Sequence, residues 1–525
     1  MLARSMIVGW VCWLSTAAPA QEISNPVAVR VDQLITAQAG RPVAPRVDDA
    51  GFCRRVMLDL AGRIPTAAEL QSFVADGSAD KRRGLIDQLL AGPEYPRRMR
   101  ELFHVVLMER LGDHEEWSKY LESSFAANVP WDQFVARILR PNPENETERG
   151  AAFFLTKRLE NYGQQAVDLP GLTRDVGRMF LGVDLLCAQC HDHLFVDDYK
   201  QVDFQGLHTF LSHTFIRQDV KFPAVGEKIL DKKTDFMSVF IKEPKQTGPR
   251  LPFGNEVEVA VFAKGEEFAV PPDKATKFPG QPKFSPLTIL SEQLPSGAND
   301  RFVRNGVNRF WWMMFGRGLV HPLDLSHSAN PPSHPEVLDL LAEEFAAHRF
   351  DIKWLLRELA LTEAYQRSSQ LPADGPEPAA DRYVVALEKP LSSEQLATVT
   401  WTATGHAEPL PDDVRKKFIA AFANPPREPE GDFAPSVKAA LFLSHDATVL
   451  SWLQPGSGNL AERLTQNADT SVLIRDLYHT VLSRDPSEEE SAMLTQFVTQ
   501  STDRPKAIGH AIWALLTSTE FCVNH

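Results

Sequence analysis

The chain has 525 residues, more than one hydrophobic core usually organises, so two or three domains are expected. Hydrophobic residues make up 43% and charged residues 24% of the sequence, which is typical of globular proteins and excludes a disordered or fibrous chain. The formal charge of -14, from 55 basic and 69 acidic residues, would repel phosphates and therefore argues against nucleic acid as a partner.

The first twenty residues have the features of a signal peptide. Arg4 supplies the positive end, residues 7–16 are mostly apolar, and Ala18-Pro19-Ala20 is a small-residue cleavage site. The apolar stretch is short for a membrane-spanning helix, which needs about 20 residues. We therefore expect export with cleavage after Ala20, a periplasmic, cell-surface or extracellular location, and no transmembrane anchor in the mature protein.

Residues 21–215 are predicted to form a first helical domain. From residue 27 onward, apolar side chains recur at three- and four-residue spacings, the pattern of amphipathic helices. Thr66 is expected to start one helix, because its hydroxyl can cap the first amides while Glu69 reaches back in a capping box. Asp80 is expected to cap the next helix.

The pattern changes over residues 216–296. Prolines and glycines recur there, and Glu256 to Val261 alternate between polar and apolar residues, which is typical of a strand. A small β-rich insert is therefore predicted. Residues 297–525 return to helical spacing, beginning with an aromatic-rich helix, so the predicted fold is mainly α: two helical domains with the insert between them.

One segment recurs in the sequence. Residues 54–65 (RRVMLDLAGRIP) match residues 475–486 (RDLYHTVLSRDP), with two arginines and a proline in register. Later in each unit the phrases LLAGPEY and LLTSTEF also correspond. Although capping boxes recur by chance in helical proteins, the aligned arginines favour two related helical hairpins, each with a capping box: Thr66 with Glu69, and Ser487 with Glu490.

Residues 187–191 read Cys-Ala-Gln-Cys-His, which is the attachment signature of c-type haem. On a helical turn, positions i, i+3 and i+4 share a face, so both thiols can reach the haem vinyl groups while the imidazole reaches iron. We therefore predict that Cys187 and Cys190 attach haem c covalently and that His191 ligates its iron. Export fits this prediction, because c-type haem is attached outside the bacterial cytoplasm.

Three other interpretations of these residues stay open. Cys187 and Cys190 could form a disulfide or a redox pair in an oxidising compartment, although the surrounding pattern is helical rather than βαβ. A zinc or iron site without porphyrin would need Asp192 or His193 as further ligands, because the chain has no second Cys-x-x-Cys. The match to the haem signature could also arise by chance. The segment would then be a structural clip in a helical scaffold or polymer-binding protein.

The spacing does not fix a sixth iron ligand. His208 is the first choice, and His213 lies on the same segment. His193 follows the motif too closely to reach the opposite haem face, so we expect it to hydrogen-bond near the site or to bind a separate metal. Methionine would raise the reduction potential relative to two histidines, and the candidates are Met179, Met313 and Met314.

Other sequence features give weaker indications. His321, His327 and His334 lie in a proline-rich stretch that could face a cofactor, but residues 333–336 have the pattern of an ordinary helix start, which is the favoured interpretation. The chain has no Gly-x-Ser-x-Gly, phosphate-binding loop or dinucleotide fingerprint. Hydrolase and nucleotide-dependent functions therefore have no positive support.

Longer motifs resemble two known domains. FLGVDLLCAQCHDHLF, with FCRRVMLDLAGRIPTAAEL from Phe52, resembles the planctomycete secreted cytochrome-like domain of unknown function (PSCyt type). NRFWWMMFGRGLVHPLDLSHSANPPSHPEVLDLLAEEF and FDIKWLLRELALTEAYQRS resemble the planctomycete PSD-type domain of unknown function that usually follows it. The resemblance covers nearly the whole mature chain and implies secretion and haem binding, but no activity.

Two departures from the PSCyt-type pattern affect these expectations. Leu194 stands where that domain commonly has proline, which weakens any site geometry carried over from it. No additional cytochrome domain precedes this one, so one haem is expected. We predict a secreted c-type haem protein that works in electron transfer or as part of an extracytoplasmic oxidoreductase. Neither the redox partner nor the extracytoplasmic substrate is indicated by the sequence.

Overall fold

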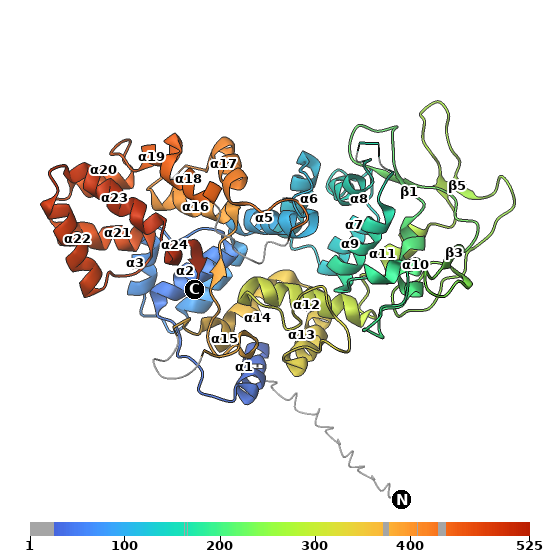
Figure 1. The fold of residues 1–525 in the computed structure, drawn as a ribbon, viewed down its shortest axis with the longest axis horizontal. Helices are drawn as coiled ribbons and strands as arrows, with labels where there is room; N and C mark the ends of the chain where they lie inside the picture. The colour runs from blue at the N-terminus through green and yellow to red at the C-terminus, as the bar shows by residue number, and fades with distance from the viewer. Residues whose placement is uncertain (1–25, 162, 165, 371–376, 407, 429–436) are drawn as a thin grey trace, which may run out of the picture.

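The computed structural model of the protein describes residues 26–161, 163–164, 166–370, 377–406, 408–428 and 437–525. The predicted signal peptide and its cleavage site lie outside these residues. Helices dominate and strands pair only as two-stranded sheets, so the predicted mainly α fold is confirmed. Figure 1 shows the C-terminal helices at one end of an elongated molecule and most of the strands at the other.

The first helical segment ends at residue 211, just before the boundary predicted from the sequence. It contains α1 (Val27–Gln38), α2 (Asp49–Leu60), α3 (Ala67–Ala75), α4 (Lys81–Ala91), α5 (Glu94–Met108), α6 (Glu115–Ala126), α7 (Trp131–Leu139), the 3-10 helix η1 (Arg149–Ala152), α8 (Phe153–Arg158), α9 (Leu169–Leu181), the 3-10 helix η2 (Cys187–Gln189) and α10 (Gln201–Leu211).

Three small antiparallel sheets follow, β1 with β2, β3 with β4 and β5 with β6. The strands are β1 (Thr214–Ile216), β2 (Val225–Glu227), β3 (Thr234–Met237), β4 (Pro244–Thr247), β5 (Phe268–Val270) and β6 (Gln281–Pro282). The strand predicted over residues 256–261 is wrong. Glu256 forms an isolated bridge with Arg250, and the N–H of Val257 donates to the carbonyl oxygen of Pro249 (2.7 Å), but residues 257–261 belong to no strand.

The rest of the described chain is helical apart from one short sheet, in which β7 (Lys389–Pro390) pairs with β8 (Val523–Asn524). Its helices are α11 (Pro286–Gln293), α12 (Asp300–Phe315), α13 (Pro335–Ala347), α14 (Ile352–Leu361), α15 (Glu363–Gln366), the 3-10 helix η3 (Ala380–Arg382), α16 (Ser393–Ala403), α17 (Asp412–Phe422), α18 (Val437–His445), α19 (Ala447–Trp452), α20 (Leu460–Gln466), α21 (Thr470–Val481), α22 (Glu488–Gln500), α23 (Arg504–Leu516) and α24 (Thr519–Cys522).

Two hydrophobic cores organise these elements. The larger core joins α1–α10 to α11–α15, and the aromatic helix α12 takes part as expected, since the ring of Phe310 lies 5.4 Å from Trp131 and 5.7 Å from Phe103. The smaller core holds α16–α24 together with Leu58 and Ile64 from the N-terminal segment. The first helical segment therefore contributes side chains to the core around α11–α15 and also to the core around α16–α24.

Of the two helix starts predicted from the sequence in the first helical domain, one has the predicted cap and the other does not. Thr66 forms the predicted capping box with Glu69 at the start of α3. The predicted cap by Asp80 is wrong, because no side-chain hydrogen bond caps α4. Asp80 has φ -98° and ψ 8° rather than the extended backbone that an N-cap residue usually adopts, so its carboxylate does not reach the first amides.

Candidate functional site

The Cys-x-x-Cys-His motif lies in the loop between α9 and α10. Gly182 ends α9 in the left-handed conformation at φ 67°, which glycine adopts without strain. On the other side, the backbone N–H of Gln201 at the start of α10 donates to the Asp192 side chain (2.8 Å). Both ends of the loop are therefore fixed by neighbouring helices.

Cys187 and Cys190 are exposed free thiols, and His191 beside them is partly exposed. The turn that carries them is the 3-10 helix η2 rather than an α-helical turn. The N–H groups of Cys190 and His191 lie 3.3 and 3.4 Å from the carbonyl oxygen of Cys187. The motif thus starts on a tighter turn than the α-helical turn that was predicted, and Cys190 and His191 come after its last residue, Gln189.

The imidazole of His191 is held in one tautomer. Its Nδ1 lies 2.6 Å from the carbonyl oxygen of Asp192. A carbonyl only accepts hydrogen bonds, so Nδ1 carries the proton and Nε2 of the neutral ring keeps its lone pair. This is the state in which a histidine ligates a metal through Nε2, with a backbone carbonyl fixing the ring.

Side chains from both flanking helices hold the motif turn through Gln189. Arg174 on α9 donates to the Gln189 side chain, and Gln205 on α10 donates to its carbonyl oxygen (3.1 Å). The turn that carries the thiols is thus hydrogen-bonded to both flanking helices.

The β3–β4 hairpin of the insert reaches the motif. The N–H of Val239 donates to the carbonyl oxygen of Cys190 (3.1 Å), and the ring of Phe240 lies 4.6 Å from that of His191. Exposed apolar side chains gather on the hairpin and the motif loop, with Phe195 89% and Phe240 65% exposed. We call this set the apolar rim: Leu186, Leu194, Phe195, Met237, Val239, Phe240 and Ile241.

His193 organises the loop that follows the motif. Its ring Nδ1 accepts hydrogen bonds from the backbone N–H groups of Phe195 (3.2 Å) and Val196 (2.9 Å). The backbone N–H of His193 donates to the carbonyl oxygen of Tyr199 (2.8 Å). Because backbone amides only donate, the proton of the neutral ring is on Nε2. The ring of His193 thus hydrogen-bonds the backbone of the loop beside the motif.

His208 lies on α10 and reaches α9. The hydroxyl of Thr173 donates to the Leu169 carbonyl oxygen (2.9 Å), so it accepts from His208 Nδ1 (3.0 Å), and Nε2 of His208 keeps a lone pair. Burial lowers the pKa of His208, which keeps the ring neutral. Its neighbour His213 contacts the hydroxyl of Ser212 (3.0 Å).

Four other sequence candidates are buried and not exposed beside the thiols. Met179, Met313 and Met314 are buried in the larger core. His334 is buried at the start of α13, with its ring 5.5 Å from that of Tyr383, in line with the helix-start interpretation. Within the described residues, no group of three or more His, Cys, Asp or Glu side chains is arranged to hold a metal ion.

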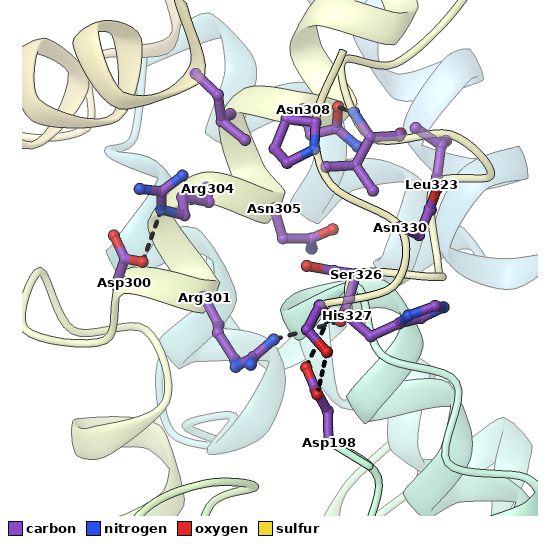
Figure 2. Close-up of a pocket in the computed structure, with 14 residues that line it drawn as sticks. Asp198, Asp300, Arg301, Arg304, Asn305, Asn308, Leu323, Ser326, His327 and Asn330 are labelled. Carbon is purple, nitrogen blue, oxygen red and sulfur yellow. Dashed lines mark hydrogen bonds and ion pairs between the residues drawn. The ribbon is translucent and has the colours of Figure 1, made fainter. Parts of the chain in front are cut away.

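A pocket of about 310 Å³ lies next to the segment that follows the motif. Asp198 lines it, and the next residue, Tyr199, packs its ring 6.0 Å from His193 and 5.5 Å from His327. Figure 2 shows Arg301 and Asn305 reaching from α12 toward the segment that carries Ser326 and His327, whereas Arg304 turns to Asp300. Sequence reasoning missed this pocket, because its walls come from distant segments: Asp198, Asp300, Arg301, Arg304, Asn305, Asn308, Val320, Leu323, Ser326, His327, Ser328, Asn330, Pro332 and Leu338.

The fold and the motif define a mainly helical protein with a surface Cys-x-x-Cys-His loop. Two family models match it in the expected order: PSCyt2, a protein of unknown function (DUF1549), over residues 30–215, and PSD1, a protein of unknown function (DUF1553), over residues 288–421. The chain therefore contains a PSCyt2 domain followed by a PSD1 domain. No curated protein and no solved structure was found to match it. Among the described helices, none has the length and apolar character required to cross a membrane.

Proposed function

We propose that this protein is an exported c-type haem protein that carries one porphyrin on Cys187, Cys190 and His191. It would work in electron transfer or as part of an extracytoplasmic oxidoreductase. The supporting observation is the combination of two exposed thiols, an imidazole with a free Nε2 and the surrounding apolar rim. This donor set fits a porphyrin, because thioether attachment needs accessible thiols and the macrocycle needs an apolar surface.

Each group of the site has a distinct part in this proposal. The bound haem would supply one-electron chemistry. Cys187 and Cys190 would hold the porphyrin edge, and His191 would ligate the iron while the carbonyl of Asp192 keeps its ring oriented. Side chains of the apolar rim would exclude water from the porphyrin, which is one of the factors that set a haem potential.

We also propose His208 as a second histidine that would hold the iron. The hydrogen bond to Thr173 leaves its Nε2 as the free acceptor, and burial keeps the ring neutral, both of which a histidine ligand requires. Met237 is the competing side chain, since it is an exposed thioether on the hairpin that contacts Cys190 and His191. A methionine there would raise the potential relative to a second histidine.

The experiment is expression with a signal peptide in a host that attaches c-type haem. We expect the purified protein to show a Soret band and a haem stain that survives denaturation. The double variant Cys187→Ala/Cys190→Ala should lose the stain, and His191→Ala should lose the native spectrum. Cys522→Ala is the matched control, because this thiol lies in α24 and packs against the smaller core, so its replacement should leave the haem in place.

Two results would contradict the proposal. Folded wild-type protein that carries neither porphyrin nor metal would favour a helical scaffold or polymer-binding protein, with the motif as a structural clip. Zinc or iron found by elemental analysis without porphyrin would favour a non-haem metal protein that uses the same cluster. Either result has to be obtained with exported protein, because attachment takes place outside the cytoplasm.

A further inference from the structure

The pocket in Figure 2 is built from both families' domains and has no part in the proposed haem site. Asp198 comes from the PSCyt2 domain, whereas α12 and the segment of residues 320–332 belong to the PSD1 domain. Its volume of about 310 Å³ falls at the lower end of the range of small-molecule sites. A pocket at a junction between domains is a common place for a small ligand.

Arg301 offers hydrogen-bond donors to this pocket. Its guanidinium lies 3.7 Å from the ring centre of Phe253, and Nη1 donates to the carbonyl oxygen of Ser326 (3.3 Å). Within the described residues, no carboxylate forms an ion pair with Arg301. Arg304, by contrast, is neutralised by Asp300 and Asp339. Arg301 is therefore the arginine of the pocket that remains available to a ligand.

Two buried groups of the pocket lack partners. Asn305 is only 6% exposed, and its amide nitrogen donates to the carbonyl oxygen of Met179 (2.8 Å), but no donor in the described protein reaches its Oδ1. Nδ1 of His327 is also buried without a partner. Such unpaired atoms are rare in native proteins and often mark the place of a missing ligand or water. Figure 2 shows the Asn305 amide between α12 and the segment that carries Ser326.

The charges of the lining residues balance. Arg301 and Arg304 are offset by Asp198 and Asp300, and burial lowers the pKa of His327, which favours its neutral form. The apolar residues of the lining, which we call the apolar wall, are Val320, Leu323, Pro332 and Leu338. An anion or a cation would gain little from this balanced field, whereas a neutral molecule with both polar and apolar faces would match it.

We infer that this pocket binds a neutral polyhydroxylated molecule, such as a single sugar unit. A hydroxyl group both donates and accepts, so one ligand can supply a donor to Asn305 Oδ1 and an acceptor to Arg301. The C–H groups of the same ligand would pack on the apolar wall. The inference does not depend on haem, because none of the residues that line the pocket belongs to the proposed haem site.

The test uses the full mature protein, and the probes are D-glucose and D-galactose with their charged counterparts D-glucuronate and D-glucosamine. Binding is measured by saturation-transfer NMR and by calorimetry. We expect saturable binding of at least one neutral sugar and weaker binding of both charged probes. Arg301→Gln should weaken the binding of the neutral sugar by about tenfold, as expected for the loss of a hydrogen bond to a charged group.

Asn305→Leu removes the unpaired acceptor and should weaken binding to a similar extent. If that variant does not fold, Arg301→Gln alone still decides the question, because its side chain is not part of the hydrophobic core. Arg475→Gln is the matched control, since this arginine lies on α21 in the C-terminal helices, and its replacement should leave binding unchanged. The inference is overturned if neither neutral sugar binds, if a charged probe binds more tightly, or if binding survives both pocket variants.

Discussion

Arg63 and Arg484 make the same hydrogen bonds at equivalent points of two related helical units. Nη1 of Arg63 donates to Glu69 Oε2 (2.8 Å), and Nη1 of Arg484 donates to Glu490 Oε2 (2.8 Å). Nε of Arg63 donates to Glu94 (2.5 Å), as Nε of Arg484 does to Glu520 (2.6 Å). The glutamates of the matching phrases LLAGPEY and LLTSTEF therefore have the same role in both copies.

The duplication predicted from the sequence extends to the ends of the helices. Asp48 caps α2 as Asp469 caps α21, and capping boxes start both α3 and α22. The two copies pack asymmetrically, because Arg54 is buried and donates to the carbonyl oxygens of Val481 and Phe521. The equivalent Arg475 is exposed. The first copy therefore uses this arginine to contact the second, whereas the second copy leaves it at the surface.

The first prediction concerns the stability contributed by these arginines. Arg63→Ala should lower the free energy of unfolding by about 1–3 kcal/mol, because it leaves two partly buried glutamates without their donor. Arg484→Ala should have a smaller effect, since its side chain is 34% exposed against 18% for Arg63. Urea unfolding measures both. Arg475→Ala is the control, and an effect equal to that of Arg63→Ala would contradict the prediction.

The second prediction concerns acid stability. Burial of Glu69 opposes its ionisation, but hydrogen bonds from Arg63 and Thr66 outweigh it and lower its pKa from 4.5 to about 2. The hydrogen bond from Arg484 lowers the pKa of Glu490 to about 2 as well. Between pH 4.5 and about 2 the unfolded chain binds more protons than the folded protein does. The free energy of unfolding therefore falls as the pH falls from 4.5 toward 2.

The variants Glu69→Gln and Glu490→Gln should each flatten that dependence. The measurement is the free energy of unfolding in urea at several pH values within the window. Glu488→Gln changes a neighbouring exposed carboxylate outside the capping box and serves as the control. A slope in Glu69→Gln as steep as that of the wild type would show that the pKa of Glu69 is not lowered in the folded protein.

Features that depend only on residues close together in the sequence could be predicted from it. The capping box of Thr66 and Glu69 needs only four consecutive residues, and it forms as expected. The strand predicted at Glu256 fails because a strand requires a partner that its own sequence does not specify. Asp80 fails as a cap because the backbone around it turns away from the extended conformation.

The surroundings of the motif depend on long-range packing and could not be predicted. Nothing in the insert sequence indicates that Val239 would meet Cys190 or that Phe240 would lie on His191. The only signal is the apolar run from Val239 to Ile241 in a polar segment. The pocket is even harder to predict from the sequence, since Asp198 and Arg301 are brought together only by the folding of two domains.

The third prediction tests the proposed sixth ligand in haem-loaded protein. His208→Ala should open the iron to added imidazole, and His208→Met should raise the reduction potential relative to the wild type. Met237→Ala is the matched variant on the other side of the motif and should leave the spectrum unchanged. The measurements are absorbance with imidazole titration and redox potentiometry. A changed spectrum in Met237→Ala, with none in His208→Ala, would transfer the ligand role to Met237.

The last prediction concerns Asp59, which connects the two hydrophobic cores. Its buried carboxylate on α2 accepts hydrogen bonds from the hydroxyl of Tyr365 on α15 (2.7 Å), Nζ of Lys389 in β7 (2.6 Å) and the amide of Asn524 in β8 (2.9 Å). Lys389 also donates to the carbonyl oxygen of Met314 on α12 (2.8 Å). Removing the carboxylate would leave a buried ammonium without its counter-charge.

Asp59→Ala should therefore destabilise the protein by about 3–5 kcal/mol, the usual result of breaking a buried ion pair from one side. Asp59→Ala/Lys389→Met removes both charges and should recover part of that loss, because the remaining groups are then neutral. Asp87→Ala is the control, since Asp87 and Arg357 form a more exposed pair that should contribute less than about 1 kcal/mol. If the double variant is as unstable as the sum of Asp59→Ala and Lys389→Met alone, the two residues do not act as a pair, and the cores are joined by packing rather than by this charge.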